Sequence, residues 1–296
     1  MTIKKKLKGT GVAIVTPFRK DSSIDFLSLQ KLLDHVLNNG VNYLVVLGTT
    51  GETATLNSNE KKAVLNFVID TVEKKVPIVA GFGGNNTGEI VSNIKHNNLS
   101  GIDAILSVSP YYNKPSQKGL YNHYKAIANA SSLPIILYNV PGRTSVNISA
   151  ETTVQLANDF ENIVALKDAS GNFEQNMKIL KNKPDDFMLI SGDDLLTLPL
   201  ISMGAHGVIS VTANAFPKEY STLVNCALAG KFKEAMKLQK SLLDIILAIF
   251  EEGNPAGVKA ALRILDIAQN YLRQPLEPIS KASYNKLSKL IKQTQE

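Results

Sequence analysis

The sequence predicts an α/β protein, a (β/α)8 TIM barrel that continues into a C-terminal helical extension. Eight short apolar runs recur along the chain, and segments with helical spacing of apolar residues lie between them. Such repeats imply right-handed crossovers and an all-parallel sheet, and eight of them close a barrel of about 250 residues. A doubly wound sheet is the alternative, but the first run is followed by Thr16-Pro17-Phe18 instead of a glycine-rich phosphate turn.

The eight runs are apolar and rich in β-branched residues, which is typical of strands buried on both faces. Their regular spacing leaves room for a helix between successive strands. In chain order we expect strands at Gly11–Pro17, Tyr43–Gly48, Ile78–Gly83, Ala104–Pro110, Ile135–Val140, Ile163–Lys167, Met188–Gly192 and Gly207–Val211.

Helix signals fill the segments between the runs. Residues Phe26–Leu37 repeat apolar side chains at helical spacing, and Gly40 follows as the expected C-cap. A second helix over residues 63–72 is expected to begin at an N-cap, either Asn57 or Ser58. Further helices are expected to begin near Ser116, Ser149, Asn172 and Pro217.

The strand–helix alternation stops after about residue 230. Three amphipathic helices are expected beyond it, at Lys231–Glu251, Ala256–Tyr271 and Ile279–Gln293. We therefore divide the chain into a barrel over residues 1–230, which carries the active site, and a helical extension over residues 231–296.

Composition excludes several classes of protein. Apolar residues at 44% and charged residues at 20% are ordinary globular values, which argues against disorder. The net charge of +6 comes from lysine-rich stretches such as Lys4-Lys5-Lys6 without interleaved aromatic residues, so we expect no nucleic-acid partner. No apolar stretch approaches the ~20 residues of a membrane span, and Cys226 is the only cysteine. We expect a cytoplasmic protein that binds no membrane.

Two neighbouring runs end in residues that packing does not explain. One contains Tyr138 and continues to Arg143, and the next ends in Lys167-Asp168. Burying an ammonium group is costly unless it is paired or neutral. A neutral lysine is a nucleophile for carbonyl carbons, and a tyrosine one strand away can carry protons. Alternatively, Asp168 pairs with Lys167, which makes the lysine structural.

The other strand ends are candidates because barrel active sites lie at the C-terminal ends of the strands. The turn Gly48-Thr49-Thr50-Gly51-Glu52 can aim backbone N–H groups at a carboxylate, or it is an ordinary glycine turn. Arg143 follows a Pro-Gly turn and can clamp a carboxylate bidentately, or it forms a surface salt bridge. Asp193 and Asp194 resemble metal ligands, but no His or further acid is spaced to join them, so we expect no metal site.

Four motifs together resemble the dihydrodipicolinate synthase family of pyruvate-dependent class I aldolases. They are Gly48–Glu52, Tyr138–Thr144, Lys167-Asp168 and Gly207–Val211, and the resemblance runs from about Gly9 into the C-terminal helices. It implies condensation of pyruvate with L-aspartate 4-semialdehyde in lysine and diaminopimelate biosynthesis. It also implies a homo-oligomer, usually a dimer of dimers, and no cofactor, because the imine of pyruvate serves as the electron sink.

The resemblance implies four catalytic residues. Lys167 forms the Schiff base with pyruvate, and Tyr138 shuttles protons. Thr50 relays protons between Tyr138 and Tyr112, and Tyr112 comes from the neighbouring subunit.

It also implies a set of substrate contacts. Thr49 and Thr50 hold the pyruvate carboxylate, and Arg143 binds the carboxylate of the semialdehyde. Gly192 and the carbonyl of Ile209 line the pocket.

The family suggests a regulatory site as well, because its lysine-inhibited members bind L-lysine at the dimer interface. Ser58 and Lys61 replace residues that are His in inhibited bacterial enzymes, and the fixed cation of Lys61 leads us to expect weak or absent inhibition. The matching positions are Thr53, Ala54, Ser58, Lys61, Asn85, Glu89 and Tyr111.

Two other functions remain as alternatives. A sister class I aldolase would split a 2-keto sugar acid, as N-acetylneuraminate lyase does, but Arg143 argues against it. A non-catalytic barrel would only bind a keto acid, and the complete set of Lys167, Tyr138, Thr50 and Tyr112 argues against that.

Overall fold

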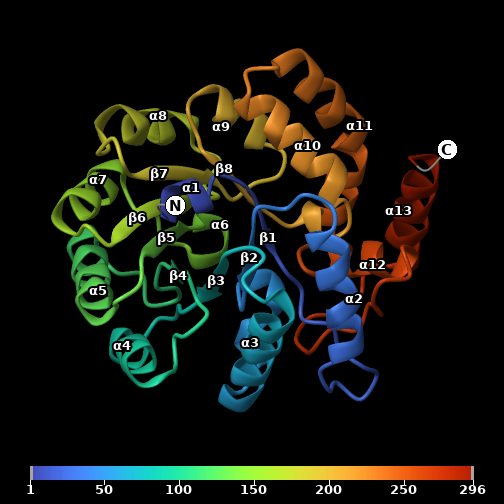
Figure 1. Ribbon diagram of the computed structural model, residues 1–296, viewed down its shortest axis with the longest axis horizontal. Coiled ribbons are helices and arrows are strands. Elements are labelled where there is room, and N and C mark those ends of the chain that lie inside the picture. The colour runs from blue at the N-terminus through green and yellow to red at the C-terminus, as the bar shows by residue number, and fades with distance from the viewer. Residues whose placement is uncertain (1–2, 295–296) are drawn as a thin grey trace.

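The computed structural model describes residues 3–294 and contains a closed barrel of eight parallel strands (Figure 1). Each strand pairs with its neighbours in the chain, and β1 pairs with β8 to close the barrel. Residues 1–2 of the expected barrel and 295–296 of the expected extension lie outside the described residues. The (β/α)8 prediction is confirmed. The strands are β1 (Gly9–Ala13), β2 (Tyr43–Val46), β3 (Ile78–Gly81), β4 (Ala104–Val108), β5 (Ile135–Asn139), β6 (Ile163–Asp168), β7 (Met188–Ser191) and β8 (Gly207–Ser210).

All eight expected strands are present, but most end earlier than predicted. The clearest case is the first, where a strand expected to reach Pro17 ends at Ala13. The N–H of Ile14 still donates to the carbonyl of Val45 on β2, but the N–H of Val15 donates to the side chain of Asn214 and not to a neighbouring strand. The apolar pattern continues into these loops because they too are buried.

Helices surround the barrel as an outer ring (Figure 1). Of the two expected N-caps, Asn57 is the one present, and it forms a full capping box with Glu60. The helix starts expected near Ser116, Ser149, Asn172 and Pro217 are confirmed, and the first three residues are N-caps. The ring helices are α2 (Phe26–Leu37), α3 (Ser58–Val72), α4 (Thr87–His96), α5 (Gln117–Ala130), α7 (Ala150–Asp159), α8 (Phe173–Asn182), α9 (Thr197–Ser202) and α10 (Pro217–Leu228). Short helical turns are α1 (Ile3–Lys6), η1 (Thr49–Gly51), η2 (Thr53–Thr55), α6 (Pro141–Thr144) and η3 (Thr212–Asn214).

One expected cap is wrong. Helix α2 ends at Leu37 with Asn38 as its C-cap in the right-handed region, whereas Gly40 lies two residues further on with φ +82°. A left-handed residue is therefore needed in the connection to β2 and not at the helix end, and glycine takes that conformation at low cost.

The extension contains three helices: α11 (Phe232–Phe250), α12 (Ala256–Ile264) and α13 (Lys281–Gln293). They pack on one another, and α11 also packs on α9 and α10 of the ring. The helix expected over Ala256–Tyr271 is too long, since α12 ends at Ile264 and Asp266 has a left-handed backbone. Among residues 3–294, no helix is both long enough and apolar enough to cross a membrane.

Contacts to the barrel explain why α12 ends early. The side chain of Lys259 donates to the carbonyl of Tyr271 at 2.9 Å, so the chain folds back over α12. Arg273 then reaches the carbonyls of Ser22 and Thr55 and the carboxylate of Glu60. A continuous helix to Tyr271 would carry these groups away from the barrel.

Apolar side chains form two core layers. The larger layer lies between the strands and the helices, and the smaller one fills the barrel interior with residues such as Tyr43, Met188 and Ile209. At the N-terminal end of the barrel, α1 lies across the opening (Figure 1). Leu7, which follows α1, is fully buried in the interior layer. The opposite end, where the strands finish, is the end at which active sites of such barrels lie.

A buried ion pair joins the extension to the barrel. Lys259 of α12 pairs with Glu52, which follows the β2 turn, and both side chains are almost completely inaccessible to solvent. Glu52 also accepts from the N–H of Arg273 at 3.1 Å, and the ammonium group of Lys259 lies 4.2 Å from the ring centroid of Phe18. Burial lowers the pKa of Lys259 to about 8, although the attraction of Glu52 opposes this shift.

We predict that Lys259→Met lowers the free energy of unfolding by about 3–5 kcal/mol, because it leaves the Glu52 carboxylate buried without a cation to balance its charge. Urea denaturation measures the change. The double variant Glu52→Gln with Lys259→Met is expected to recover much of the loss. Lys286→Met removes an exposed pair with Glu251 and serves as the matched control, with an expected loss of about 0–1 kcal/mol. If the single and double variants lose the same free energy of unfolding, the loss does not come from the unbalanced charge of Glu52.

Candidate active site

Tyr138 and Lys167 lie side by side on neighbouring strands. They are register partners between β5 and β6, so their side chains point to the same side of the sheet. Tyr138 belongs to the cluster inside the barrel, and only 6% of Tyr138 and 5% of Lys167 are exposed. The Nζ atom of Lys167 lies 4.1 Å from the centroid of the Tyr138 ring. No carboxylate of residues 3–294 lies within ion-pair distance of this nitrogen.

Asp168 has a different set of partners. Its carboxylate accepts from the side chains of Asn139 at 2.9 Å, Asn176 at 3.1 Å and Ser170 at 2.7 Å. Asn139 is its register partner on β5, so this pair occupies the face opposite to Tyr138 and Lys167. Asp168 therefore does not neutralise Lys167, which argues against a purely structural lysine.

Gly192, just after β7, gives Lys167 the space it occupies. A Cβ atom at this position would lie 3.0 Å from Cε of Lys167 and 3.0 Å from Cβ of Ala169, which is tighter than ordinary contact. The N–H of Gly192 donates to the carbonyl of Asp168 at 2.7 Å, which fixes its backbone beside β6. Ile209, the other expected pocket residue, is buried on β8 in the same interior cluster as Tyr138.

The Thr49-Thr50 turn is held by its neighbours. Both threonines lie in η1, at the C-terminal end of β2, and Thr50 is 3% exposed. The hydroxyl of Thr16 donates to the carbonyl of Gly51 at 2.7 Å, which ties this turn to the loop after β1. Glu52 ends the turn with φ +54° and carries the ion pair to Lys259. A short helical turn of this kind leaves backbone N–H groups free for an anion.

Arg143 lies on α6, directly after β5, and is exposed. Its Nη2 atom donates to the backbone carbonyl of Asn254 at 3.0 Å. Among the described residues no carboxylate pairs with Arg143, so the alternative of a surface salt bridge is not realised within residues 3–294. The rest of the guanidinium group is free to bind a carboxylate.

Sequence reasoning missed Asn254. This residue lies between α11 and α12, and its Nδ2 atom donates to Oγ1 of Thr50 at 2.9 Å while its carbonyl accepts from Arg143. It thus connects the turns that follow β2 and β5. The Asn-Pro dipeptide between two helical segments indicates a turn, but nothing in the sequence indicates that this turn reaches the active site.

Tyr112 is not part of the buried group. It lies in the loop after β4, is 90% exposed and has φ +74°, an uncommon conformation for a bulky residue. Such an exposed ring cannot pack against the buried Lys167 of its own chain. The expected sharing of Tyr112 between subunits stays a prediction.

The positions expected to bind L-lysine come from four places in the chain. Asn85 donates to the carbonyl of Tyr111 at 3.3 Å, so the turn after β3 contacts the loop after β4. Within the described chain, Lys61 and Glu89 form no ion pair with each other. The lysine site and its weak inhibition stay predictions. The remaining positions are Thr53 and Ala54 in η2 and Ser58 at the start of α3.

Asp193 and Asp194 hold the loops after β7 and β8. Asp193 accepts from the N–H groups of Leu195 and Leu196, and burial raises the pKa of its carboxyl group. Asp194 accepts from both the N–H and the hydroxyl of Thr212 at 2.7 Å. In residues 3–294 no three His, Cys, Asp or Glu side chains gather as they would around a metal ion.

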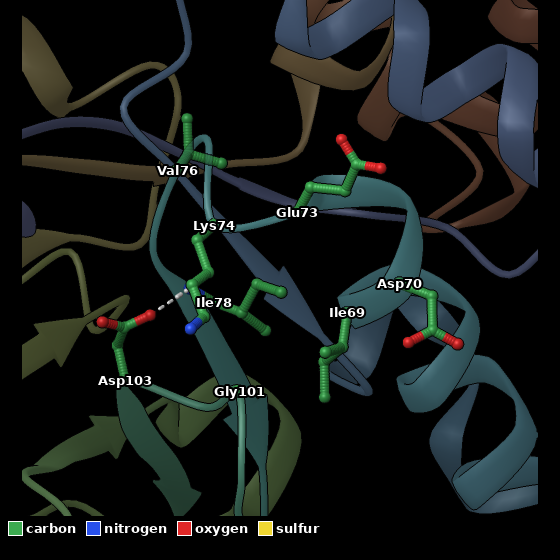
Figure 2. A pocket seen from close by; sticks show the side chains of 8 residues that line it. All are labelled: Ile69, Asp70, Glu73, Lys74, Val76, Ile78, Gly101 and Asp103. Atoms are coloured by element: carbon green, nitrogen blue, oxygen red, sulfur yellow. Dashed lines mark hydrogen bonds between the residues drawn. The ribbon is translucent and has the colours of Figure 1, made fainter.

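A separate surface pocket of about 330 Å³ lies among residues at the end of α3, the start of β3 and the turn before β4 (Figure 2). Ile78 begins β3 and Asp103 precedes β4, so the pocket is at the N-terminal ends of these strands. Asp103 accepts from the N–H of Ile78 at 3.0 Å (Figure 2). The pocket is therefore remote from Lys167, which lies near the C-terminal end of β6. Its lining residues are Ile69, Asp70, Glu73, Lys74, Val76, Ile78, Gly101 and Asp103.

Comparison with known proteins agrees with this geometry. The model of the dihydrodipicolinate synthetase family matches residues 6–294. A relative from Parabacteroides distasonis, named 4-hydroxy-tetrahydrodipicolinate synthase, is 52% identical over 287 residues, which cover 97% of each chain.

Solved structures give the same result. A chloride-inhibited dihydrodipicolinate synthase from Acinetobacter baumannii, complexed with pyruvate, is 41% identical with a TM-score of 0.94, covering 98% of this chain and 99% of that one. A monomeric dihydrodipicolinate synthase variant is 38% identical with a TM-score of 0.96, covering 99% of this chain and 98% of the variant. Matches of this extent in sequence and structure establish that the chain belongs to the dihydrodipicolinate synthetase family.

Proposed function

We propose that this protein condenses pyruvate, held as a Schiff base on Lys167, with L-aspartate 4-semialdehyde. The observation that carries the proposal is the placement of Lys167, which is buried beside Tyr138 without a carboxylate partner among residues 3–294. The family is enzymatic, its members are lyases, and it uses no external cofactor, because pyruvate itself becomes the covalent electron sink. The activity belongs to lysine and diaminopimelate biosynthesis.

The first half of the reaction takes place at Lys167. Its amine attacks the carbonyl carbon of pyruvate and water leaves, which forms the imine. The imine withdraws electrons from the adjacent methyl group, which then loses a proton and gives an enamine. Tyr138 is placed to move these protons, and the N–H groups of Thr49 and Thr50 suit the pyruvate carboxylate.

The second half of the reaction takes place nearer the mouth of the barrel. The enamine carbon attacks the aldehyde carbon of the semialdehyde, and the new carbon–carbon bond leads to a hydroxylated tetrahydrodipicolinate. Arg143 binds the carboxylate of the semialdehyde, since its guanidinium group is exposed and anchored on one side only. The amino group of the bound semialdehyde then attacks the imine carbon, which closes the ring of the product and releases Lys167 as the free amine.

The proposed enzyme is a homo-oligomer, and a dimer of dimers is the arrangement we favour. Support comes from Tyr112, which is 90% exposed and lies outside the buried group of Lys167 and Tyr138, as suits a residue that enters the site of a partner copy. One similar solved structure is a monomeric variant, and its monomeric state is a property of that protein. The oligomeric state of this chain therefore needs a direct test.

We predict that Lys167 carries the imine. Borohydride reduction in the presence of pyruvate is expected to add one reduced pyruvyl unit to the peptide that contains Lys167, as measured by mass spectrometry. Lys167→Arg keeps a cation at the site but cannot form the imine, so no adduct is expected. An adduct on another lysine would refute the mechanism.

We predict that Arg143→Ala mainly impairs the second substrate. A hydrogen bond to a charged group contributes about 1.5–3 kcal/mol, so kcat/KM for the semialdehyde is expected to fall roughly 10- to 100-fold. Trapping of pyruvate on Lys167 is expected to survive. Arg263→Ala removes another exposed arginine. It is the matched control and is expected to have little effect. An equal loss of pyruvate trapping would show that Arg143 does not select the semialdehyde.

We predict that Tyr112 acts in the active site of a partner chain. Tyr112→Phe and Lys167→Ala are each expected to be nearly inactive alone. Mixing them under subunit exchange is expected to restore part of the activity, because one site of each hybrid dimer then has both groups. The two variants, treated separately in the same way, are the controls. Verified heterodimers without any recovery would rule out this sharing.

A further inference from the structure

Asn254 contacts two parts of the active site at once. Its side-chain amide donates to the hydroxyl oxygen of Thr50 at 2.9 Å, and its backbone carbonyl accepts from Arg143 at 3.0 Å. The two contacts use different atoms: the side chain of Asn254 binds Thr50, and its backbone carbonyl binds Arg143. A change of side chain therefore separates the two contributions.

The direction of the contact with Thr50 matters for proton transfer. An amide NH2 group can only donate, so the Thr50 oxygen is the acceptor and its own O–H points elsewhere. Among residues 3–294 this O–H has no acceptor, so its proton is available to a neighbouring group. Asn254 Oδ1 is buried and has no partner within the described residues, so the Nδ2 contact is the side-chain hydrogen bond that holds Asn254 there.

A second contact fixes Asn254 against the same turn. Lys259, five residues after Asn254, forms the buried ion pair with Glu52, two residues after Thr50. The extension and the β2 turn are therefore joined at two points. Neither segment can shift along the other without breaking the ion pair, so Asn254 Nδ2 stays aligned with Thr50.

We propose that Asn254 is a positioning residue, whose amide fixes the Thr50 hydroxyl with its proton free for the relay to Tyr138. The proposal rests on the proposed function, because it assigns Thr50 a proton-transfer role. It gives the C-terminal extension a direct part in the chemistry of the barrel. It also predicts a loss of kcat with little change in KM for the semialdehyde, because the carbonyl that orients Arg143 does not depend on the side chain.

The test compares Asn254→Ala and Asn254→Asp with Asn285→Ala, the same substitution on an exposed face of the extension. We expect kcat to fall on the order of 10-fold in both Asn254 variants, as the loss of one hydrogen bond implies. The solvent deuterium isotope effect on kcat is expected to rise as proton transfer becomes slower. Asn254→Asp keeps the shape of the side chain, but its carboxylate can only accept, so Thr50 would turn its proton toward it.

A double-variant cycle isolates the route through Thr50. In a Thr50→Val background, Asn254→Ala is expected to cause no further loss of kcat, whereas a general loss of stability would add in either background. Additive losses, wild-type kcat in Asn254→Asp, or a raised KM for the semialdehyde with unchanged kcat would each overturn the proposal. A wild-type protein that fails to condense the two substrates would contradict the proposed function instead. An active wild type with unaffected Asn254 variants would contradict only the positioning role.

Discussion

Tyr138 pairs with Lys167, and Asn139 pairs with Asp168, across the boundary between β5 and β6. Because side chains alternate along a strand, the first pair faces the barrel interior and the second faces the surrounding helices. The register depends on one irregularity: Ile135 pairs with Ile163, but Ile136 pairs with Ala165, so β6 has an extra residue. Without it, Tyr138 would face Leu166, and Lys167 would point out of the barrel.

The extension takes part in the same site, although it comes after the last strand. Lys259 and Arg273 hold Glu52, and Asn254 reaches Thr50 and Arg143. A buried ion pair adds little net stability by itself, since desolvation offsets much of the attraction. The pair instead fixes geometry, because separating the two buried ions would leave each charge without a partner. The β2 turn and the extension therefore hold one relative position.

Much of the fold could be predicted because its signals are local. Apolar runs marked all eight strands, and side chains such as Asn57 and Ser149 marked helix starts, because an N-cap acts on the next turn of the chain. Helix ends were harder to predict. The helix from Ala256 ends at Ile264, and the chain folds back so that Tyr271 contacts Lys259 and Arg273 reaches the distant Glu60, a partner that no local pattern encodes.

The sequence by itself determined the (β/α)8 barrel and the candidates Lys167, Tyr138, Thr50 and Arg143, because burial patterns and reactive residues at strand ends can be read along the chain. Tertiary structure alone decided that Lys167 lies beside Tyr138 and apart from the Asp168 carboxylate, since that depends on strand register. It also decided that Asn254 joins the site, because closing the barrel and folding back the extension bring together residues that are far apart in the chain.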